Sequence, residues 1–343
     1  MCGIVGAVAE RNVTPILIEG LQRLEYRGYD SAGVALVQAD GKVQRRREVG
    51  KVVNLSNNLD AEPLKGGLGI AHTRWATHGS VQQTNTHPHM SGNDLALVHN
   101  GIIENYITLR EELQSQGYVF ASDTDSEVIV HLIHNCLGEG GLLHAVRRAV
   151  KRLDGAYAIA VCWADEPDRI VAARSGCPLV VGKGIGENFL ASDVLALKAV
   201  TDRFIFLEEG DLVDLRRDRI DIWSIDNEAV LRADVRIEMA KDDFDKGNFR
   251  HYMQKEIFAQ PQVLKETMEG RIGKQTVLEE AFGVGAKDIF DRTQAITIVA
   301  CGTSYYAASV ARYWIEDLVG IPCQVEIASE FRYRKCAVLP NTL

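Results

Sequence analysis

The chain has 343 residues, 46% of them hydrophobic and 25% charged, and its 47 Asp and Glu outnumber its 38 Lys and Arg. The resulting net charge of −9 argues against nucleic acid as the main partner. No apolar run approaches the roughly 20 residues that cross a bilayer. The seven cysteines are scattered and form no CxxC pair, unlike a secreted disulfide framework. We therefore expect a cytosolic protein with small-molecule chemistry and, at this length, two domains.

Up to about residue 235 the pattern is one of many short strands with helices inserted in blocks. Apolar residues at helical spacing follow Pro15, and Asp40 and Gly41 lie between two strands of a predicted hairpin. This order favours two sheets with helices packed on them over an alternating βαβ fold. Strands are predicted over 2–9, 33–38, 42–49, 67–75, 95–99, 156–163, 169–174, 178–183, 188–192, 203–207 and 219–224, and helices over about 15–28, 105–116, 126–136 and 142–152.

The character of the sequence changes after residue 235. A charged, glycine-bearing segment over 241–250 is typical of a linker, and a helix is predicted from Tyr252 to Met268. A buried strand over 295–301, a turn, a helix to residue 319 and a parallel strand over 323–328 then form one βαβ unit. Such a unit leaves apolar sheet surface uncovered. Either another chain covers that surface or, as we expect, this is the front part of a longer polypeptide.

Cys2 is distinguished by its position in the chain. Removal of Met1 would place the Cys2 thiol and a free α-amine on one residue. Their reference pKa values, about 8.5 and about 7.7–8.0, are close enough for the amine to accept the thiol proton directly or through one water. Position alone does not separate this reading from a strand-initiating cysteine without chemistry.

Three further segments supply the partners that such a nucleophile needs. Arg74, at the end of a strand, offers a bidentate fork for a carboxylate. Asn100 and Gly101 offer an amide and a backbone N–H, the donors of an oxyanion hole. Of Asp123 and Asp125, one could cap the following helix and the other could hold an ammonium group. Together these groups describe attack on the side-chain carbonyl of an α-amino acid.

Five histidines between residues 72 and 99 raise the alternative of a metal site. Neither an HExxH motif nor a paired Cys–His spacing accompanies them, so we expect no metal. His72 and His99 are instead predicted to be strand residues with backbone or carboxylate partners.

Several motifs resemble the N-terminal-nucleophile (class II) glutamine amidotransferases, in particular the glutamine–fructose-6-phosphate aminotransferase family. The resemblance implies an α+β fold, with a four-layer αββα sandwich as the glutaminase domain over 2–240. After the linker over 241–250, it implies the first βαβ unit of a Rossmann-like sugar-isomerase (SIS) domain, incomplete over 251–343. The motifs are CGIVGAVA (2–9), RLEYRGYDSAG (23–33), GIAHTRWATHG (69–79), HPH (87–89), VHNGIIEN (98–105), SDTDSE (122–127), RFIFLEEGD (203–211), HYMQKEI (251–257), VACGTSYY (299–306) and VEIASEFRYR (325–334).

The resemblance also implies roles for single residues of the first domain. Cys2 would attack the glutamine carboxamide and form a γ-glutamyl thioester, with Asn100 and Gly101 as the oxyanion hole. The substrate-binding residues would be Arg74 for the α-carboxylate, Asp125 for the α-ammonium, Thr77 and His78 along the pocket, and Trp75 as a gate for ammonia.

In the second domain, Gly302, Thr303 and Ser304 would bind the sugar phosphate, although a turn of this kind is a weak signal by itself. The implied substrates are L-glutamine and D-fructose 6-phosphate, with no metal or organic cofactor, no nucleic acid and no membrane. The family pattern also implies a homodimer through the isomerase domain. Its remaining isomerase residues would lie beyond residue 343. We therefore expect this chain to hydrolyse glutamine and to make no glucosamine 6-phosphate.

Three alternatives are weighed against this interpretation. Amidophosphoribosyltransferase would carry an acidic phosphoribosyl-binding motif and asparagine synthetase a Ser-Gly-Gly-rich ATP loop, and neither occurs in this sequence. A non-catalytic sugar-phosphate sensor would have no use for the combination of Cys2, Arg74, Asn100 and Asp125. Release of glutamate from glutamine separates the enzyme from the sensor.

Overall fold

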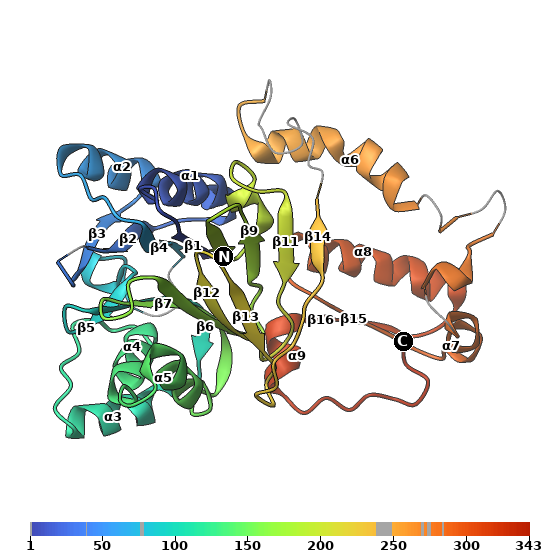
Figure 1. Ribbon diagram of the computed structural model, residues 1–343. Coiled ribbons are helices and arrows are strands. Elements are labelled where there is room, and N and C mark those ends of the chain that lie inside the picture. Colours follow the sequence, from blue (N-terminus) through green and yellow to red (C-terminus); the bar gives the residue numbers. More distant parts are fainter. Residues whose placement is uncertain are drawn as a thin grey trace. The chain divides into compact units, whose positions relative to one another are not determined.

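A computed structural model describes residues 2–38, 40–75, 79–237, 249–268, 271–272, 276–282 and 285–343 (Figure 1). Its contacts divide the chain into two units, Met1–Gly247 and Asn248–Leu343. Most of the predicted linker, residues 241–248, lies outside the described residues. Among the helices that are described, none combines the length and the apolar character needed to span a membrane.

Two antiparallel sheets form the centre of the first unit. The larger has the strand order β14-β11-β9-β10-β1-β4-β2-β3 and the smaller β13-β12-β8-β7-β6-β5. The larger sheet consists of β1 (Gly3–Val8), β2 (Ser31–Val37), β3 (Val43–Val49), β4 (Leu68–Arg74), β9 (Val180–Lys183), β10 (Asn188–Ala191), β11 (Arg203–Phe206) and β14 (Asp234–Arg236). The smaller consists of β5 (His89–Ser91), β6 (Leu95–Ile103), β7 (Gly155–Trp163), β8 (Arg169–Ser175), β12 (Leu212–Arg216) and β13 (Ile220–Trp223).

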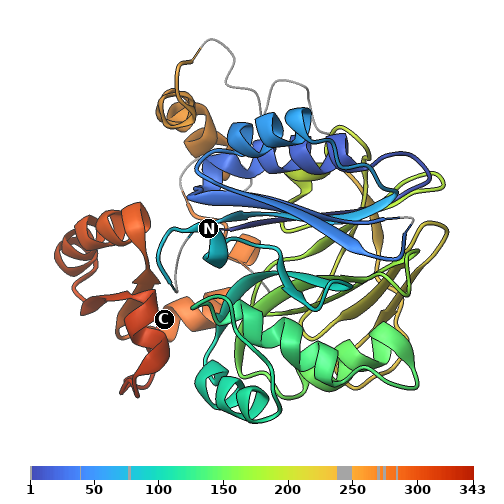
Figure 2. The same cartoon turned by 90° about the vertical axis from the view of Figure 1, so that its left-hand side faces the viewer.

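Helices cover the outer face of each sheet. On the larger sheet lie α1 (Thr14–Leu24) and α2 (Val52–Ala61), and the α1 residues Leu17, Leu21 and Leu24 are fully buried there. The smaller sheet is covered by α3 (Tyr106–Ser115), α4 (Ser126–Asn135) and α5 (Gly141–Val150). Figure 2 shows the resulting order of helices, sheet, sheet and helices. The predicted four-layer αββα sandwich is therefore confirmed.

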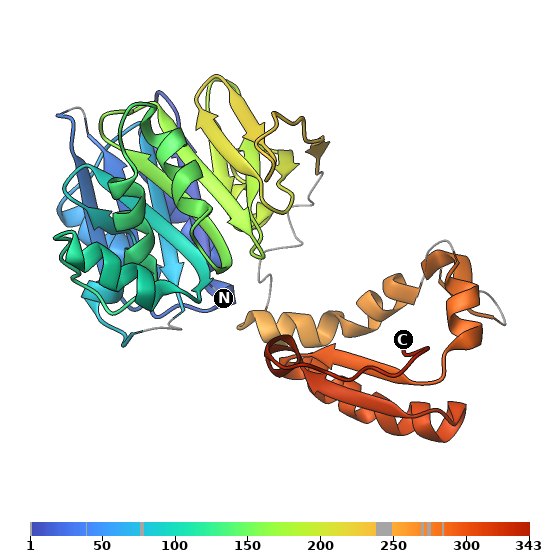
Figure 3. The same ribbon diagram turned by 90° about the horizontal axis from the view of Figure 1, so that it is seen from below.

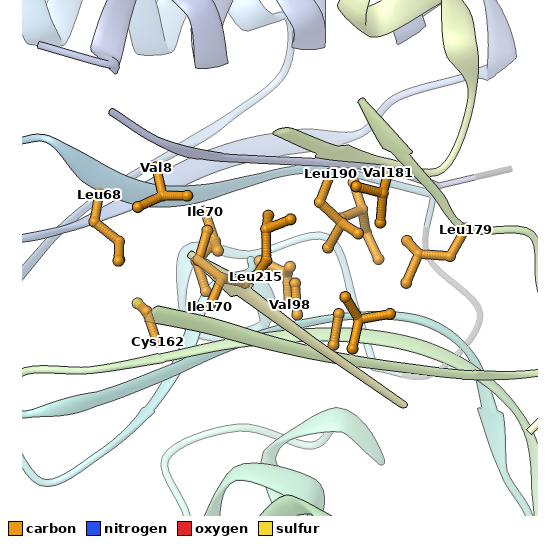
Figure 4. Close-up of a cluster of buried hydrophobic side chains, with 14 of the residues drawn as sticks. Val8, Leu68, Ile70, Val98, Cys162, Ile170, Leu179, Val181, Leu190 and Leu215 are labelled. Atoms are coloured by element: carbon orange, nitrogen blue, oxygen red, sulfur yellow. The ribbon is translucent and has the colours of Figure 1, made fainter. Parts of the chain in front are cut away.

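The space between the two sheets is filled by small and branched apolar side chains (Figure 4). Ile70 on β4, Val98 on β6, Ile170 on β8 and Leu190 on β10 are all fully buried. Because side chains of a strand alternate between its two faces, the residues two positions away from these point into the same space. The apolar filling thus fixes the position of any polar side chain at the ends of the same strands.

The second unit contains one parallel strand pair. β15 (Ile296–Ala300) pairs in parallel with β16 (Cys323–Ile327), and α8 (Gly302–Val319) connects them and runs along one face of the pair (Figure 3). The predicted βαβ unit is confirmed. Three other α-helices are described in this unit: α6 (Tyr252–Met268), α7 (Ala286–Arg292) and α9 (Ala328–Tyr333).

Two predicted boundaries differ in ways that affect the candidate sites. β6 continues to Ile103 because its pairing with β7 extends to Gly155, so Asn100 and Gly101 lie inside a strand and not after its end. α8 begins at Gly302, so the predicted turn residues are its first turn. The structure also adds elements that the sequence patterns do not predict, namely β5, β12, β14, α2, α7 and α9.

Candidate active site

Side chains from neighbouring strands meet at one end of the space between the sheets. β4 pairs with β1 in the larger sheet, and β6 faces them from the smaller sheet across the apolar core. Alternation along each strand turns the polar members toward the same interior as the apolar ones. The residues that share this orientation are Cys2 with Ile4, His72 and Arg74 with Ile70, and Asn100 with Val98.

Cys2 lies against the end of β4. The Trp75 backbone N–H donates a hydrogen bond to the Cys2 Sγ at 3.1 Å. Burial, the largest cause, raises the pKa of the Cys2 thiol above its ordinary value, and the Asp30 carboxylate acts in the same direction. The Trp75 N–H and the Arg74 guanidinium lower the pKa but do not outweigh burial. The resting thiol therefore keeps its proton at neutral pH, and its attack on a substrate requires a base.

Asn100 bridges the two sheets. Its Nδ2 donates to the Cys2 backbone carbonyl at 3.2 Å, and its Oδ1 lies 2.9 Å from the His72 Nε2. The side chain of Asn100 thus reaches from β6 to the residue that carries the thiol. An amide N–H in this position can donate to an oxyanion formed beside the Cys2 Sγ.

Gly101 follows Asn100 on β6 and carries a backbone N–H. Its φ is +132°, and a Cβ built there would lie 1.9 Å from a backbone carbonyl oxygen of β7, so glycine is required. On the side of β6 away from β7, the N–H of His99 donates to the His87 Nδ1 and the N–H of Ile103 to the Asp125 Oδ2. By strand alternation, the Gly101 N–H points to this same side, between them.

Arg74 is buried, and its guanidinium is held by neighbouring oxygen atoms. It donates to the carbonyl oxygens of Gly79 at 3.2 Å and Ser80 at 3.3 Å, and an oxygen of Asp30 lies 3.6 Å away. These contacts hold the planar fork at the end of β4, beside Cys2. A fork fixed in this way can bind a carboxylate in bidentate fashion.

Asn85 connects this loop to the segment that contains the predicted ammonium-binding residue. Its Nδ2 donates to the Ser80 carbonyl and its Oδ1 accepts the Asp123 N–H, both at 3.0 Å. Two residues further on, Asp125 stands at the N-cap position of α4, but its carboxylate accepts the Ile103 N–H instead of capping the helix. Asn85 thereby ties Arg74 to the neighbourhood of Asp125, a connection that no motif in the sequence indicates.

Two predicted pocket residues, Thr77 and His78, lie outside the described residues. Trp75 is described, and its side chain is 53% exposed. A Cβ built on Gly28, where φ is +108°, would lie 2.4 Å from the Trp75 ring, so only glycine allows the indole to lie there.

The predicted phosphate-binding residues occupy the first turn of α8. Cys301 is the extended N-cap residue, and Gly302 follows with φ of +59°. Thr303 and Ser304 come next and, like Gly302, are exposed. The first N–H groups of a helix have no partner within the helix, and they favour an anion.

His72, His87, His89 and His99 are buried histidines of this region. The pKa values of His72 and His89 are lowered to about 3, and that of His87 lies well below its ordinary value. Burial is the largest cause in each case. His72 contacts the Asn100 amide, and the His99 Nδ1 lies 2.8 Å from the Ser126 hydroxyl. Backbone or carboxylate partners are predicted for these two rings; their side-chain partners are the Asn100 amide and the Ser126 hydroxyl, and His72 also interacts with the His99 backbone. Within the described ranges, no group of three or more His, Cys, Asp or Glu side chains could hold a metal ion.

The site thus combines a partly buried thiol, an arginine fork and an amide beside the thiol. Residues 72–199 match the glutamine amidotransferase domain family, and residues 289–342 match the SIS domain family. The structure is similar to that of the allosteric regulatory enzyme of purine biosynthesis, with a TM-score of 0.58 and 26% identity over 65% of this chain and 49% of that one. It also shares its fold with glutamine phosphoribosylpyrophosphate amidotransferase of B. subtilis, with a TM-score of 0.56 and 21% identity over 94% of this chain and 65% of that one.

Among particular proteins, the whole chain is similar to glutamine–fructose-6-phosphate aminotransferases (isomerizing). It is 61% identical to that of Pseudomonas putida, 60% to that of Pseudomonas aeruginosa and 56% to that of Haemophilus influenzae. Each match covers 100% of this chain and 56% of the relative, so the chain spans little more than half the length of these proteins. The resemblance predicted from the motifs is thereby confirmed.

Proposed function

We propose that the glutaminase domain over 2–240, which lies within the first unit, hydrolyses glutamine to glutamate and ammonia. The observation that carries this proposal is the meeting of the Cys2 thiol, the Arg74 fork and the Asn100 amide at one end of the inter-sheet core. The Cys2 Sγ forms a bond to the side-chain carbonyl carbon of glutamine, and the bond from that carbon to nitrogen breaks as ammonia leaves. Water then cleaves the γ-glutamyl thioester and restores the thiol.

The thiol proton of Cys2 must be accepted by a base, and we assign this role to the terminal amine. Burial raises the pKa of the Cys2 thiol, so thiolate is scarce before the substrate binds. After removal of Met1, the α-amine of Cys2 accepts the thiol proton and passes it to the leaving nitrogen. The Asn100 Nδ2 and the Gly101 N–H donate to the oxyanion of the tetrahedral intermediate.

The two ends of glutamine are bound by opposite charges. Arg74 takes the α-carboxylate and Asp125 the α-ammonium, and the Asn85 link between their segments supports a common pocket. Thr77 and His78 line that pocket, and Trp75 gates the passage of ammonia. These last three assignments rest on the family pattern alone.

For the whole protein, we propose transfer of this ammonia to fructose 6-phosphate, which yields glucosamine 6-phosphate. Residues 251–343, after the linker over 241–250, are the beginning of the SIS domain. There Gly302, Thr303 and Ser304 bind the sugar phosphate at the start of α8. The names of the relatives support this activity, and a homodimer through this domain is proposed on the family pattern alone. We also propose a cytosolic location, because the reducing conditions of that compartment keep the Cys2 thiol reduced.

A glutamate-release assay tests the proposal on this chain. We expect the purified chain to convert glutamine to glutamate without added metal, and to form no glucosamine 6-phosphate from fructose 6-phosphate. Cys2→Ser, and a chain with one extra residue retained before Cys2, should each lose on the order of 10⁴-fold or more in kcat. Absence of glutamate, as from a sugar-phosphate sensor, contradicts the glutaminase. Amino-sugar product from this chain contradicts the proposed division of labour.

A further inference from the structure

His72 lies beside the side-chain amide of Asn100, and we propose that it is a positioning residue for the oxyanion hole. It holds the Asn100 carboxamide in the orientation that turns Nδ2 toward Cys2. This inference rests on the proposed glutaminase function and assigns a residue to that same site.

The hydrogen bonds around Asn100 fix which of its atoms faces which neighbour. The Cys2 backbone carbonyl can only accept, so the group 3.2 Å from it must be the Asn100 Nδ2. The Asn100 Oδ1 then faces the His72 Nε2 at 2.9 Å, and an amide oxygen can only accept. The His72 Nε2 must therefore carry the proton and donate it.

The charge state of His72 suits this single donation. The ring is completely buried, and burial lowers its pKa to about 3, although the Asn100 side chain and the His99 backbone favour the charged form. At neutral pH the ring is uncharged and carries one N–H, which the Asn100 contact places on Nε2. His72 can thus orient the amide without adding a second positive charge beside Arg74.

The position of His72 is set by the sheet. It lies within β4, where it pairs with Ile4 of β1 on one side and Gly33 of β2 on the other. Its ring also stacks on that of His87, with centroids 4.1 Å apart. The donor is therefore supplied by a central strand that is paired on both sides. Such support is what keeps an oxyanion donor aligned before the charge develops.

Loss of the His72 donor should affect catalysis through Asn100. The Asn100 Oδ1 would be left buried without this partner, and the amide could turn its Nδ2 away from the oxyanion. The rate cannot fall further than it does when the oxyanion donor itself is removed, which is about 10²–10³ in kcat. We expect a loss of about 10-fold to 100-fold in kcat, with KM changed by less than about threefold.

Two substitutions separate positioning from packing. In His72→Gln the side-chain NH2 falls near the place of Nε2 and can still donate to Asn100, whereas in His72→Asn it falls near Nδ1 and cannot reach. We expect His72→Gln to keep kcat within about fivefold of the wild type and His72→Asn to lose about 10-fold to 100-fold. Because the wild-type ring stays neutral, the inflections of kcat/KM against pH should be the same in His72→Gln as in the wild type. Equal kcat in the two variants overturns the inference.

His87→Asn serves as the matched control. His87 is also buried, and its ring stacks on that of His72. Its Nδ1 accepts a hydrogen bond from the backbone N–H of His99 and not from Asn100. The change therefore tests whether damage to the packing around His72 alone lowers kcat. We expect its kcat to remain within about threefold of the wild type. A loss equal to that of His72→Asn would mean that disturbed packing explains both, and it would overturn the inference.

A double-mutant cycle provides the decisive readout. If His72 acts through Asn100, the variant with both Asn100→Ala and His72→Asn should be no slower than Asn100→Ala alone, within about threefold. Multiplication of the two losses would show that His72 acts independently and would refute the positioning role. If the wild type releases no glutamate, the proposed function falls and this inference falls with it. Release by the wild type together with an unchanged His72→Asn overturns the inference alone.

Discussion

The two units of this chain differ in how they dispose of apolar surface. In the first, two sheets face each other and their inner side chains, such as Ile70 and Val98, are fully buried. In the second, one parallel strand pair with α8 leaves Val299 42%, Trp314 64% and Leu318 80% exposed. A double sheet closes its own core, whereas a βαβ unit needs cover on both faces. The first unit can therefore hold a fixed polar site at the end of its core without further chain.

The largest expected effect of this difference is on the free energy of unfolding, when one apolar side chain in each unit is replaced by alanine. Ile70→Ala opens a cavity between the sheets and should lower the free energy of unfolding of the first unit by about 2–5 kcal/mol. Val299→Ala on β15 removes a side chain that is already 42% exposed and should cost less than about 1 kcal/mol. Hydrogen exchange of peptides from β4 and from β15, measured in one sample, reads the two units separately. Similar losses in both would contradict the contrast in closure.

Within the first unit, Asn100→Ala should cost about 2.7–4 kcal/mol of transition-state stabilisation, a fall of about 10²–10³ in kcat for glutamine hydrolysis. The reason is loss of the Nδ2 donor beside Cys2. Ser309→Ala, which removes a hydroxyl that bonds to the Tyr305 carbonyl within α8, is the control from the second unit and should leave this rate unchanged. An Asn100→Ala enzyme with wild-type kcat would remove the amide from the oxyanion hole.

A smaller effect is expected from Arg74→Gln. The change keeps a donor at the end of β4 but removes the charge and the fork, and hydrogen bonds to a charged group contribute about 1.5–3 kcal/mol. We expect kcat/KM for glutamine to fall by about 10-fold to 100-fold, mainly through KM, because the α-carboxylate does not take part in the bond exchange. Steady-state kinetics over a wide range of glutamine concentration measures this. A selective loss of kcat would place Arg74 in the chemical step instead.

Much of the fold could be predicted from sequence periodicity, and the omissions have physical causes. β12 reads LVDLR, and a strand with Asp214 at its centre does not look buried. Asp214 is nevertheless 1% exposed, because Arg169 donates two hydrogen bonds to its carboxylate from the neighbouring strand β8. α2 reads VVNLSNNLDA, whose asparagines have low helix propensity, and packing of Leu55 against the sheet outweighs that preference.

The candidate site could be predicted as a set of residue types but not as a network. The motifs indicate Cys2, Arg74 and Asn100, and the structure brings these three together. The contact of His72 with Asn100 depends on two strands from different sheets, 28 residues apart. The Asn85 link likewise joins two loops by tertiary contacts alone. Local patterns carry no information on such pairs.

The buried histidines extend the comparison of the two units to their stability in acid. His72, His87 and His89 lie in the first unit with pKa values far below the ordinary value of 6.5, whereas His251 of the second unit is exposed. Each buried ring stays neutral when folded but takes up a proton when unfolded. Its contribution to stability is therefore complete above about pH 6.5 and declines as the pH falls toward about 3.

For each such ring the slope approaches about 1.4 kcal/mol per pH unit once the unfolded ring is fully protonated. The first unit should thus lose stability steeply between pH 6 and pH 5, above the range in which carboxylates titrate, and the second unit should not. His87→Leu removes one of the three rings and should reduce the slope by about one proton. Urea unfolding at pH 6.5, 6.0, 5.5 and 5.0, with hydrogen exchange to read each unit, measures both slopes. An unchanged slope in His87→Leu would show that this ring is not buried in its neutral form.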